Sequence, residues 1–324
     1  MSKCMRLFVV LAGLGSLSAS VNAGDPEPQI VTFPAADGFT LTADYYPPPA
    51  KPPGDAPFAI LLHMYRSDRK SWQPLIPPLC DAGFAVLALD LRGHGESATT
   101  ETRDVVEKRD PEVFKKMQDD LRGAYDWLAT QPRIDRARFA LVGASVGCSL
   151  ALRYAAEDCS VDAIVCLSPG LNYMQIDSAG DIRQLGGRHV LMLATPDERD
   201  APYTLKQKAA QEVNIQIYDG HKAHGTNMFG TVPEMEQTIV NFLRRAVGEP
   251  STSVVVGSIK SNIYHQPGTE WAKRIAPQNL RCYSSPAEAE SRGLRAAKSR
   301  GPRESGADDE ESPPPRKPDR KKKS

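Results

Sequence analysis

Short apolar runs alternate with helix-like segments between residues 58 and 247. The runs lie at 58–63, 84–90, 138–143, 161–167, 189–194 and 213–218, and the helix-like segments at about 71–82, 110–131, 146–157, 203–211 and 232–247. Strands that are apolar along their whole length are buried on both faces, so the alternation predicts a mostly parallel sheet covered by helices on either side. Residues 29–46 add two strands around the turn Asp37-Gly38. The expected fold class is therefore α/β, with eight strands of which the first two form an antiparallel edge.

The N-terminal segment has the features of a secretory signal peptide. Lys3 and Arg6 precede an apolar stretch, and small residues follow it up to Ala23. The alternative is a buried N-terminal helix, which the glycines and serines of the stretch disfavour. The sequence thus predicts a signal peptide over 1–23 and a secreted or periplasmic protein.

Charge and composition suggest further boundaries. Lys plus Arg and Asp plus Glu number 40 each, but residues 251–300 hold eight Lys and Arg against three Glu, which leaves residues 24–250 acidic. Residues 301–324 are rich in Gly, Pro, Ser and charged residues, and they predict a disordered tail. We therefore expect one domain over 24–250 and a small α+β module over 251–300. The balanced charge does not indicate a nucleic-acid partner, and no apolar run reaches the length of a membrane span.

The cysteines do not suggest a disulfide framework or a thiol nucleophile. Five remain after the signal peptide, an odd number that cannot all pair within one chain. Cys148 and Cys166 lie in apolar helix and strand patterns, which predicts that they are core residues.

The strongest local signal is Gly143-Ala144-Ser145-Val146-Gly147, a G-x-S-x-G sequence between a predicted strand and a predicted helix. In this context the serine occupies a sharp turn that exposes its hydroxyl, and the helix that begins there directs N–H groups at developing negative charge. The sequence predicts that Ser145 is a nucleophile.

A nucleophilic serine needs a base and an orienting carboxylate. His224 follows the last predicted strand and is the expected base, with His221 as the local competitor. The loop after residue 194 holds three acids, and Asp197 is the expected partner because it comes first after the strand, with Asp200 and Glu198 as alternatives.

Two further loops fall where they could complete the site. The loop after the third strand, His63 to Asp68, should offer a backbone N–H to an oxyanion, with the N–H of Val146 as the second donor. The run 90–97 is expected to form a wall of the site. His63 and His94 could suggest a metal, but no acidic or cysteine spacing supports one, so loop-shaping hydrogen bonds are the favoured interpretation.

Residues 26–248 resemble a small α/β-hydrolase of the dienelactone-hydrolase-like and serine carboxylesterase groups. The matching pieces are Leu62-His63-Met64-Tyr65, the run 90–97, Gly143–Gly147 and Ala223-His224-Gly225-Thr226. The resemblance implies the eight-stranded fold and cofactor-free ester hydrolysis through an acyl-enzyme, with Tyr65 at the oxyanion position. Met64 replaces the usual glycine, and Ser145 replaces the cysteine of dienelactone hydrolases proper.

Residues 253–300 carry a weaker resemblance to the zinc-binding module of Ada-type alkylation-repair proteins. The matching pieces include Val254–Gly257, Ser261–Pro267 and Ala287–Leu294. The cysteines that such modules carry are missing at the corresponding positions, so no metal is expected, and His265 is interpreted as a packed or surface residue.

The sequence as a whole predicts a secreted serine hydrolase that cleaves small or surface-displayed carboxylic esters without a cofactor. Only residues 168–188 separate the sixth and seventh strands, too few for a large lid. The alternatives are a prolyl-oligopeptidase-like serine peptidase and a non-catalytic surface-binding protein. The oligomeric state is left open.

Overall fold

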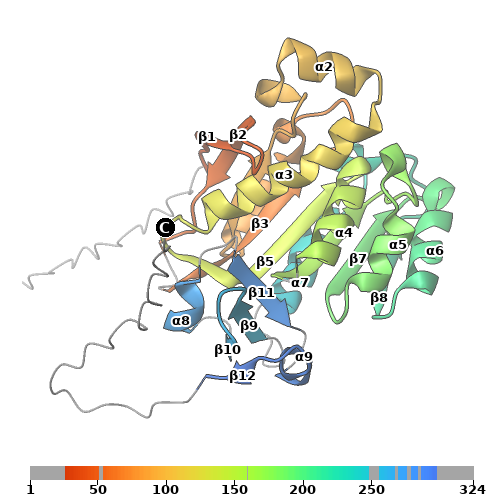
Figure 1. The fold of residues 1–324 in the computed structure, drawn as a ribbon. Coiled ribbons are helices and arrows are strands. Elements are labelled where there is room, and N and C mark those ends of the chain that lie inside the picture. The colour runs from red at the N-terminus through yellow and green to blue at the C-terminus, as the bar shows by residue number, and fades with distance from the viewer. Residues whose placement is uncertain are drawn as a thin grey trace, which may run out of the picture.

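The structure, a computed structural model, describes residues 26–50, 54–158, 160–247, 255–266, 269–275, 279–283 and 286–297. The predicted signal peptide over 1–23, the predicted boundary at residue 250 and the predicted tail over 301–324 lie outside these ranges. Figure 1 shows a large twisted sheet between layers of helices, with a second, smaller sheet below it.

The large sheet has eight strands in the order β1-β2-β4-β3-β5-β6-β7-β8. β1 pairs with β2 and β2 with β4 in antiparallel fashion, and every later pair is parallel. This confirms the predicted eight-stranded, mostly parallel sheet with an antiparallel edge. The strands are β1 Gln29–Pro34, β2 Thr40–Tyr46, β3 Ala56–Leu62, β4 Ala85–Leu89, β5 Ile134–Ala144, β6 Val161–Leu167, β7 His189–Ala194 and β8 Val213–Ile217.

Helices cover both faces of the sheet and enclose two separate apolar clusters. One cluster lies under α3, α4 and α6 and includes Phe114, Leu152 and Leu205. The other lies under α1 and α7 and includes Leu79 and Ile239. The central strands β3 to β6 contribute to both clusters because their alternate side chains point to opposite faces. The helices are α1 Ile76–Asp81, α2 Thr100–Glu107, α3 Pro111–Leu128, α4 Val146–Glu157, α5 Ser178–Asp181, α6 Asp200–Lys208 and α7 Met235–Ala246.

Helix α2 is an element that the apolar pattern did not predict. It is polar, with Val106 as its buried residue, and it begins with a capping box in which Thr99 and Thr102 satisfy each other's backbone N–H groups. Capping rather than an apolar stripe therefore marks its start. In Figure 1 it lies beyond one end of the sheet, above α3.

Buried ion pairs hold the loop that follows β4. Arg69 is buried and contacts Asp44, Asp90 and, at 2.9 Å, Glu96. Asp90 also accepts the backbone N–H groups of Arg69 and Glu96, each at 2.8 Å. A buried carboxylate needs such partners to remain charged. The predicted wall over 90–97 is thus tied to β2 and to the loop after β3.

A second sheet occupies the C-terminal part, in the order β11-β9-β10-β12. Its elements are β9 Val255–Ser258, β10 Ile263–His265, α8 Glu270–Lys273, β11 Leu280–Tyr283, α9 Pro286–Ser291 and β12 Arg295–Ala296. Its small core is built on Val255, Tyr264 and Ala289. A hydrogen bond of 2.7 Å from Arg136 Nη2 to the carbonyl of Ile275 joins the two parts.

Candidate active site

Ser145 occupies the sharp turn between β5 and α4. Its φ of 54° and ψ of −117° place it outside the regions that a non-glycine residue normally adopts. Such a conformation costs about 1–3 kcal/mol and persists only where the surroundings enforce it. Here the N–H of Ser145 donates to the carbonyl of Leu167 on β6 at 2.9 Å, and its own carbonyl accepts from the N–H of Cys148 at 2.9 Å.

The two glycines of the G-x-S-x-G sequence are required by close backbone approach. A Cβ on Gly143 would lie 2.3 Å from the carbonyl oxygen of Gly147, and a Cβ on Gly147 would lie 2.3 Å from that of Leu62 at the end of β3. Neither contact is sterically allowed, so only glycine fits. The first turn of α4 therefore rests directly on the end of β3, which brings the Val146 position close to the loop that carries Tyr65.

His224 and Glu198 form the carboxylate–imidazole pair of the site. The Nδ1 of His224 lies 2.5 Å from Oε1 of Glu198, and both side chains are partly buried. His224 follows β8, and Glu198 ends the short 3₁₀ turn η5 (Pro196–Glu198) that follows β7. Because β5, β7 and β8 are parallel, their carboxyl ends lie along the same edge as Ser145.

The expectation that Asp197 faces His224 is wrong in this structure. Asp197 and Asp200 are both exposed, whereas Glu198 is partly buried and contacts the imidazole. The reason is the 3₁₀ turn, in which consecutive side chains point about 120° apart, so Asp197 and Glu198 cannot face the same side. The predicted choice of His224 over His221 agrees with this pair.

Burial and hydrogen bonding act in opposite directions on the Glu198 carboxyl. Burial alone would raise its pKa, but interactions with His224 and with the Ser168 hydroxyl outweigh it and hold the pKa below its ordinary value. Glu198 is therefore ionised at neutral pH, the state needed to orient an imidazole.

Ser168 is a residue of the site that the sequence analysis missed. It follows β6 directly, is fully buried and has a φ of 55°, a strained value for serine. Its hydroxyl accepts the N–H of Gly225 at 2.9 Å, beside His224, and it also interacts with Glu198. Ser168 thus links the loop of the imidazole to the carboxylate. In the sequence, the signal that could have pointed to Ser168 was its place at a strand end, directly before Pro169-Gly170.

Met64 packs at the point where the His224 loop meets the serine turn. A Cβ built on Gly225 would lie 2.9 Å from Met64 Sδ and 3.4 Å from the Cβ of Ala144, which precedes Ser145. The loop after β3, the serine turn and the histidine loop therefore meet in space. Met64, which stands where the resemblance leads us to expect a glycine, fills this junction.

Tyr173 contacts both the predicted nucleophile and the predicted base. Its ring lies edge-on to that of His224, with centroids 6.5 Å apart and an interplanar angle of 88°. Its phenol also interacts electrostatically with the side chain of Ser145. Tyr173 belongs to the segment between β6 and β7. From the sequence, this segment was expected only to be too short for a large lid.

The side chain of Tyr65 points away from this centre. Its hydroxyl lies 3.5 Å from the carbonyls of Val106 and Glu107 on α2, and its ring packs edge-on to Phe114 of α3. The main chain of Tyr65 is thus the part left for the predicted oxyanion role. That role, with the Val146 N–H as partner, stays a prediction.

His63 and His94 shape the loops beside the site. The Nε2 of His63 accepts the N–H of Leu91 at 3.1 Å, and its Nδ1 pairs with the carbonyl of Met64 at 2.8 Å. The Nδ1 of His94 pairs with the carbonyl of Arg92 at 3.2 Å. Burial lowers the pKa of both imidazoles. Across the described ranges, no three His, Cys, Asp or Glu side chains are grouped as a metal site would require.

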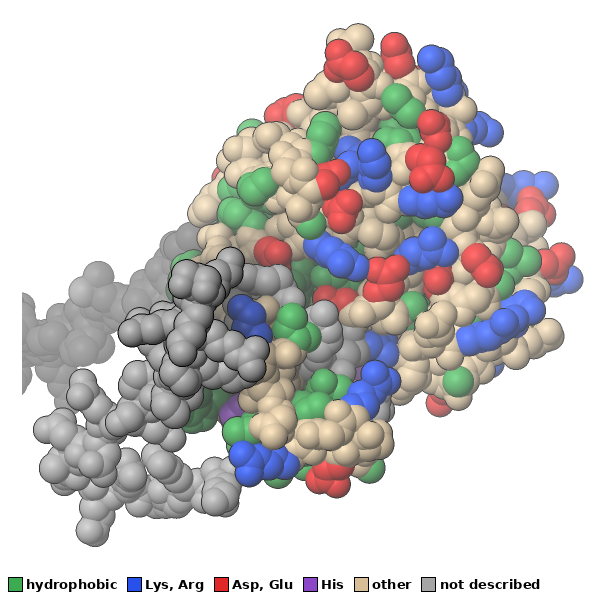
Figure 2. All heavy atoms as spheres, viewed as in Figure 1, with side chains coloured by type: hydrophobic (Ala, Val, Ile, Leu, Met, Phe, Trp, Pro, Cys, Tyr) green, Lys and Arg blue, Asp and Glu red, His purple; other side chains and the backbone are tan. Residues whose placement is uncertain are grey.

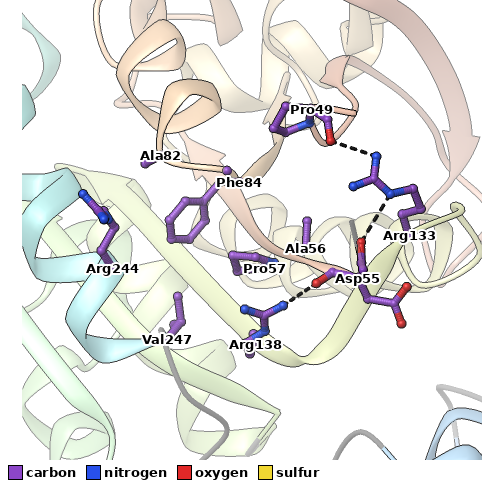
Figure 3. A pocket seen from close by; sticks show the side chains of 12 residues that line it. Pro49, Asp55, Ala56, Pro57, Ala82, Phe84, Arg133, Arg138, Arg244 and Val247 are labelled. Atoms are coloured by element: carbon purple, nitrogen blue, oxygen red, sulfur yellow. Dashed lines mark hydrogen bonds between the residues drawn. The ribbon is translucent and has the colours of Figure 1, made fainter. Parts of the chain in front are cut away.

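The pocket of Figure 3 lies at the opposite end of the sheet. Its volume is about 290 Å³, and its lining includes Ala56 at the start of β3, Phe84 just before β4 and Arg138 near the start of β5. Arg138 donates to the carbonyl of Asp55, and Arg133 donates to that of Pro49 at 2.8 Å, so both guanidinium groups hold the local backbone. Because Ser145 follows the carboxyl end of β5, this pocket is not part of the serine centre.

Charges on the face that carries α2, α3 and α4 are of both signs. Figure 2 shows Lys and Arg side chains interspersed with Asp and Glu over this face, without a field of one sign. Within the described residues, no helix is long and apolar enough to cross a membrane.

Comparison with known proteins agrees with this architecture. Residues 58–215 match the model of a family described as serine aminopeptidase, S33. No curated protein sequence matches the chain significantly. The matches do not support the Ada-type resemblance of residues 253–300, because the family match ends at residue 215.

Solved structures share the fold at low sequence identity. The dienelactone hydrolase of Anabaena variabilis is 17% identical, with a TM-score of 0.55 over 68% of this chain and 99% of its own. The Pyrococcus furiosus esterase Pf2001 is 19% identical, with a TM-score of 0.54 over 68% of this chain and 92% of its own. The Pyrococcus horikoshii acylaminoacyl peptidase is 16% identical, with a TM-score of 0.55 over 68% of this chain and 42% of its own. The sheet order, the serine turn between β5 and α4 and these neighbours together identify the chain as having the fold of the α/β-hydrolase superfamily.

Proposed function

We propose that this protein is a serine hydrolase that cleaves carboxylic esters through an acyl-enzyme on Ser145. The observation that carries the proposal is the His224–Glu198 pair, 2.5 Å between Nδ1 and Oε1, at the same sheet edge as the strained serine turn. A hydroxyl, an imidazole and a partly buried carboxylate on three loops at one edge are the parts of a catalytic triad.

Each residue then has a defined role. His224 takes the proton of Ser145 as its oxygen attacks the acyl carbon, and Glu198 holds the imidazole in the required tautomer and stabilises its charged form. The backbone N–H groups of Tyr65 and Val146 stabilise the oxyanion. A water molecule deacylates the enzyme with His224 as base. The proposed reaction needs no metal and no organic cofactor.

The short connection between β6 and β7 favours small or surface-displayed esters. Among the described elements between β6 and β7 there are only short turns, η3 Tyr173–Gln175, α5 and η4 Ile182–Gln184. In the connection after β4, the chain adds the eight-residue polar helix α2. Residues 1–23 have the features of a signal peptide. We therefore propose that the hydrolysis takes place outside the cytoplasm, in the periplasm or beyond the cell.

A peptidase is the second candidate, and a specific observation favours it. The family match is described as a serine aminopeptidase, and an acylaminoacyl peptidase shares the fold. That peptidase extends well beyond the matched part, since only 42% of it is covered. Esters are preferred here because the match spans 99% of the dienelactone hydrolase and 92% of the Pf2001 esterase.

The test compares wild type with Ser145→Ala on matched short acyl substrates, p-nitrophenyl esters and p-nitroanilides. We expect ester turnover, lowered by about 10³-fold or more in the variant, and labelling of wild type alone by a fluorophosphonate probe. Turnover of the anilides with little ester hydrolysis would establish the peptidase instead. Absence of labelling at Ser145 would establish a non-catalytic binding protein.

A further inference from the structure

The segment between β6 and β7 places one phenol at the serine centre. Tyr173 presents its ring edge to His224, and its phenol interacts with the Ser145 side chain. The residue is partly exposed. Neither the sequence patterns nor the family match assigns a role to it.

The local chain holds this ring in place at a conformational cost. A Cβ on Gly170 would lie 2.5 Å from the Tyr173 ring, so the ring rests on the backbone of Gly170. Met174 and Gln175 follow with φ values of 51° and 62°, and Ile176 then anchors the segment as a fully buried side chain. Two strained residues in succession indicate that the surroundings enforce the position of Tyr173.

The phenol lies on the side of Ser145 where the leaving group of the substrate is expected. In a serine hydrolase the imidazole that removed the serine proton returns it to the leaving group, so the leaving-group oxygen lies on the histidine side of the serine. A side chain whose ring meets the His224 ring edge-on and whose phenol interacts with the Ser145 side chain lies on that side. Burial raises the pKa of Tyr173 to about 12, so its hydroxyl is a protonated donor at neutral pH.

We propose that Tyr173 is a catalytic residue that donates a hydrogen bond to the leaving-group oxygen of the ester. This inference rests on the proposed function and deepens it. The Ser145 oxygen bonds to the acyl carbon and its proton passes to His224. When the tetrahedral intermediate collapses, the bond from carbon to the leaving-group oxygen breaks and the electron pair remains on that oxygen. The oxygen receives the proton from His224, and Tyr173 keeps its own proton throughout.

The test is a leaving-group series with the full chain. Wild type and Tyr173→Phe are compared by kcat/KM, which reports acylation, on esters of one acyl group with p-nitrophenol, phenol and ethanol as leaving groups. The ring and its packing remain in the variant, so only the hydroxyl is removed. Because a hydrogen bond to a charged oxygen is worth about 10- to 100-fold, we expect such a loss for the ethyl ester and a loss of only a few fold for the p-nitrophenyl ester.

Two controls separate this role from a structural one. Tyr203→Phe removes the hydroxyl of an exposed tyrosine on α6 and should not change any member of the series. Labelling of Tyr173→Phe by a fluorophosphonate should stay within a few fold of wild type, because fluoride leaves without a proton. An equal loss across the series, or no loss for any ester, would overturn the proposal.

The outcome also distinguishes this inference from the proposed function. Should wild type cleave only the matched amides, the ester activity is wrong, and the same comparison is made with anilide and p-nitroanilide leaving groups. A larger loss for the anilide would then support leaving-group donation by Tyr173, and a uniform loss would contradict it.

Discussion

Glu198 and Asp197 are neighbours in one short turn, and only Glu198 can face the imidazole of His224. The turn η5 directs Asp197 to solvent and Glu198 inward, and the lowered pKa of Glu198 keeps it ionised. The longer glutamate side chain spans the gap between two loops that follow different strands. Ser168 supports the arrangement from a third loop, through the N–H of Gly225.

We predict that Glu198→Gln lowers kcat by about 10³- to 10⁴-fold, because the imidazole loses the charge that fixes its tautomer. Asp197→Asn is the matched control and should keep turnover within about twofold, since that side chain is exposed. Steady-state kinetics on a p-nitrophenyl ester measures both. A large loss of kcat in Asp197→Asn with near-normal kcat in Glu198→Gln would show that Asp197, not Glu198, orients His224.

At the scale of elements, buried polar groups join the loops that surround the site. The imidazole of His63 links the loop after β3 to the loop after β4, through Met64 and Leu91. Arg69 links the same two loops to β2. These connections tie together the loops at the carboxyl ends of β3 and β4.

His63 predicts a pH dependence of stability. Burial lowers its pKa to about 3 in the folded protein, whereas the unfolded chain binds a proton near pH 6.5. The unfolded state thus binds more protons between these two values, and the folded protein loses stability as the pH falls through this window. From pH 7.5 to 5, this group removes about 2 kcal/mol from the free energy of unfolding.

Urea denaturation at the two pH values checks this prediction. His63→Gln keeps a donor and an acceptor but does not titrate, so its loss of stability between pH 7.5 and 5 should be smaller than that of wild type by about 2 kcal/mol. His189→Gln replaces an exposed histidine and should behave like wild type. Identical pH dependence in all three proteins would show that His63 accepts a proton within the fold.

At the scale of the whole molecule, the two sheets have separate cores. The clusters of the large sheet end at Val247, and the small sheet packs on Val255, Tyr264 and Ala289. Every residue of the candidate site belongs to the large sheet and its loops. Among the described residues, the contact from Arg136 to Ile275 is a polar link between the two parts.

A chain of residues 24–250 should therefore keep ester turnover within a few fold of residues 24–324. The full-length Arg136→Ala variant is measured alongside, because it removes the hydrogen bond to Ile275 and keeps the small sheet. Thermal melting of all three shows whether the small sheet supports the body. Loss of turnover in the shorter chain with a normal melting temperature would mean that residues beyond 250 contribute to the site.

The amino-acid sequence by itself determined most of the elements and two residues of the candidate site. Apolar runs and amphipathic segments are local patterns, and they predicted the eight strands and the helices that cover them, while the polar helix α2 carried only a capping signal. The glycines around Ser145 and the loop of His224 could also be recognised locally. Tertiary structure alone decided the rest, because the Glu198 carboxylate and the segment that carries Ser168 and Tyr173 meet His224 only when the sheet brings their strand ends together. The turn at Glu198, the bridge at Ser168 and the strained segment at Tyr173 depend on those contacts, and no spacing along the chain reports them.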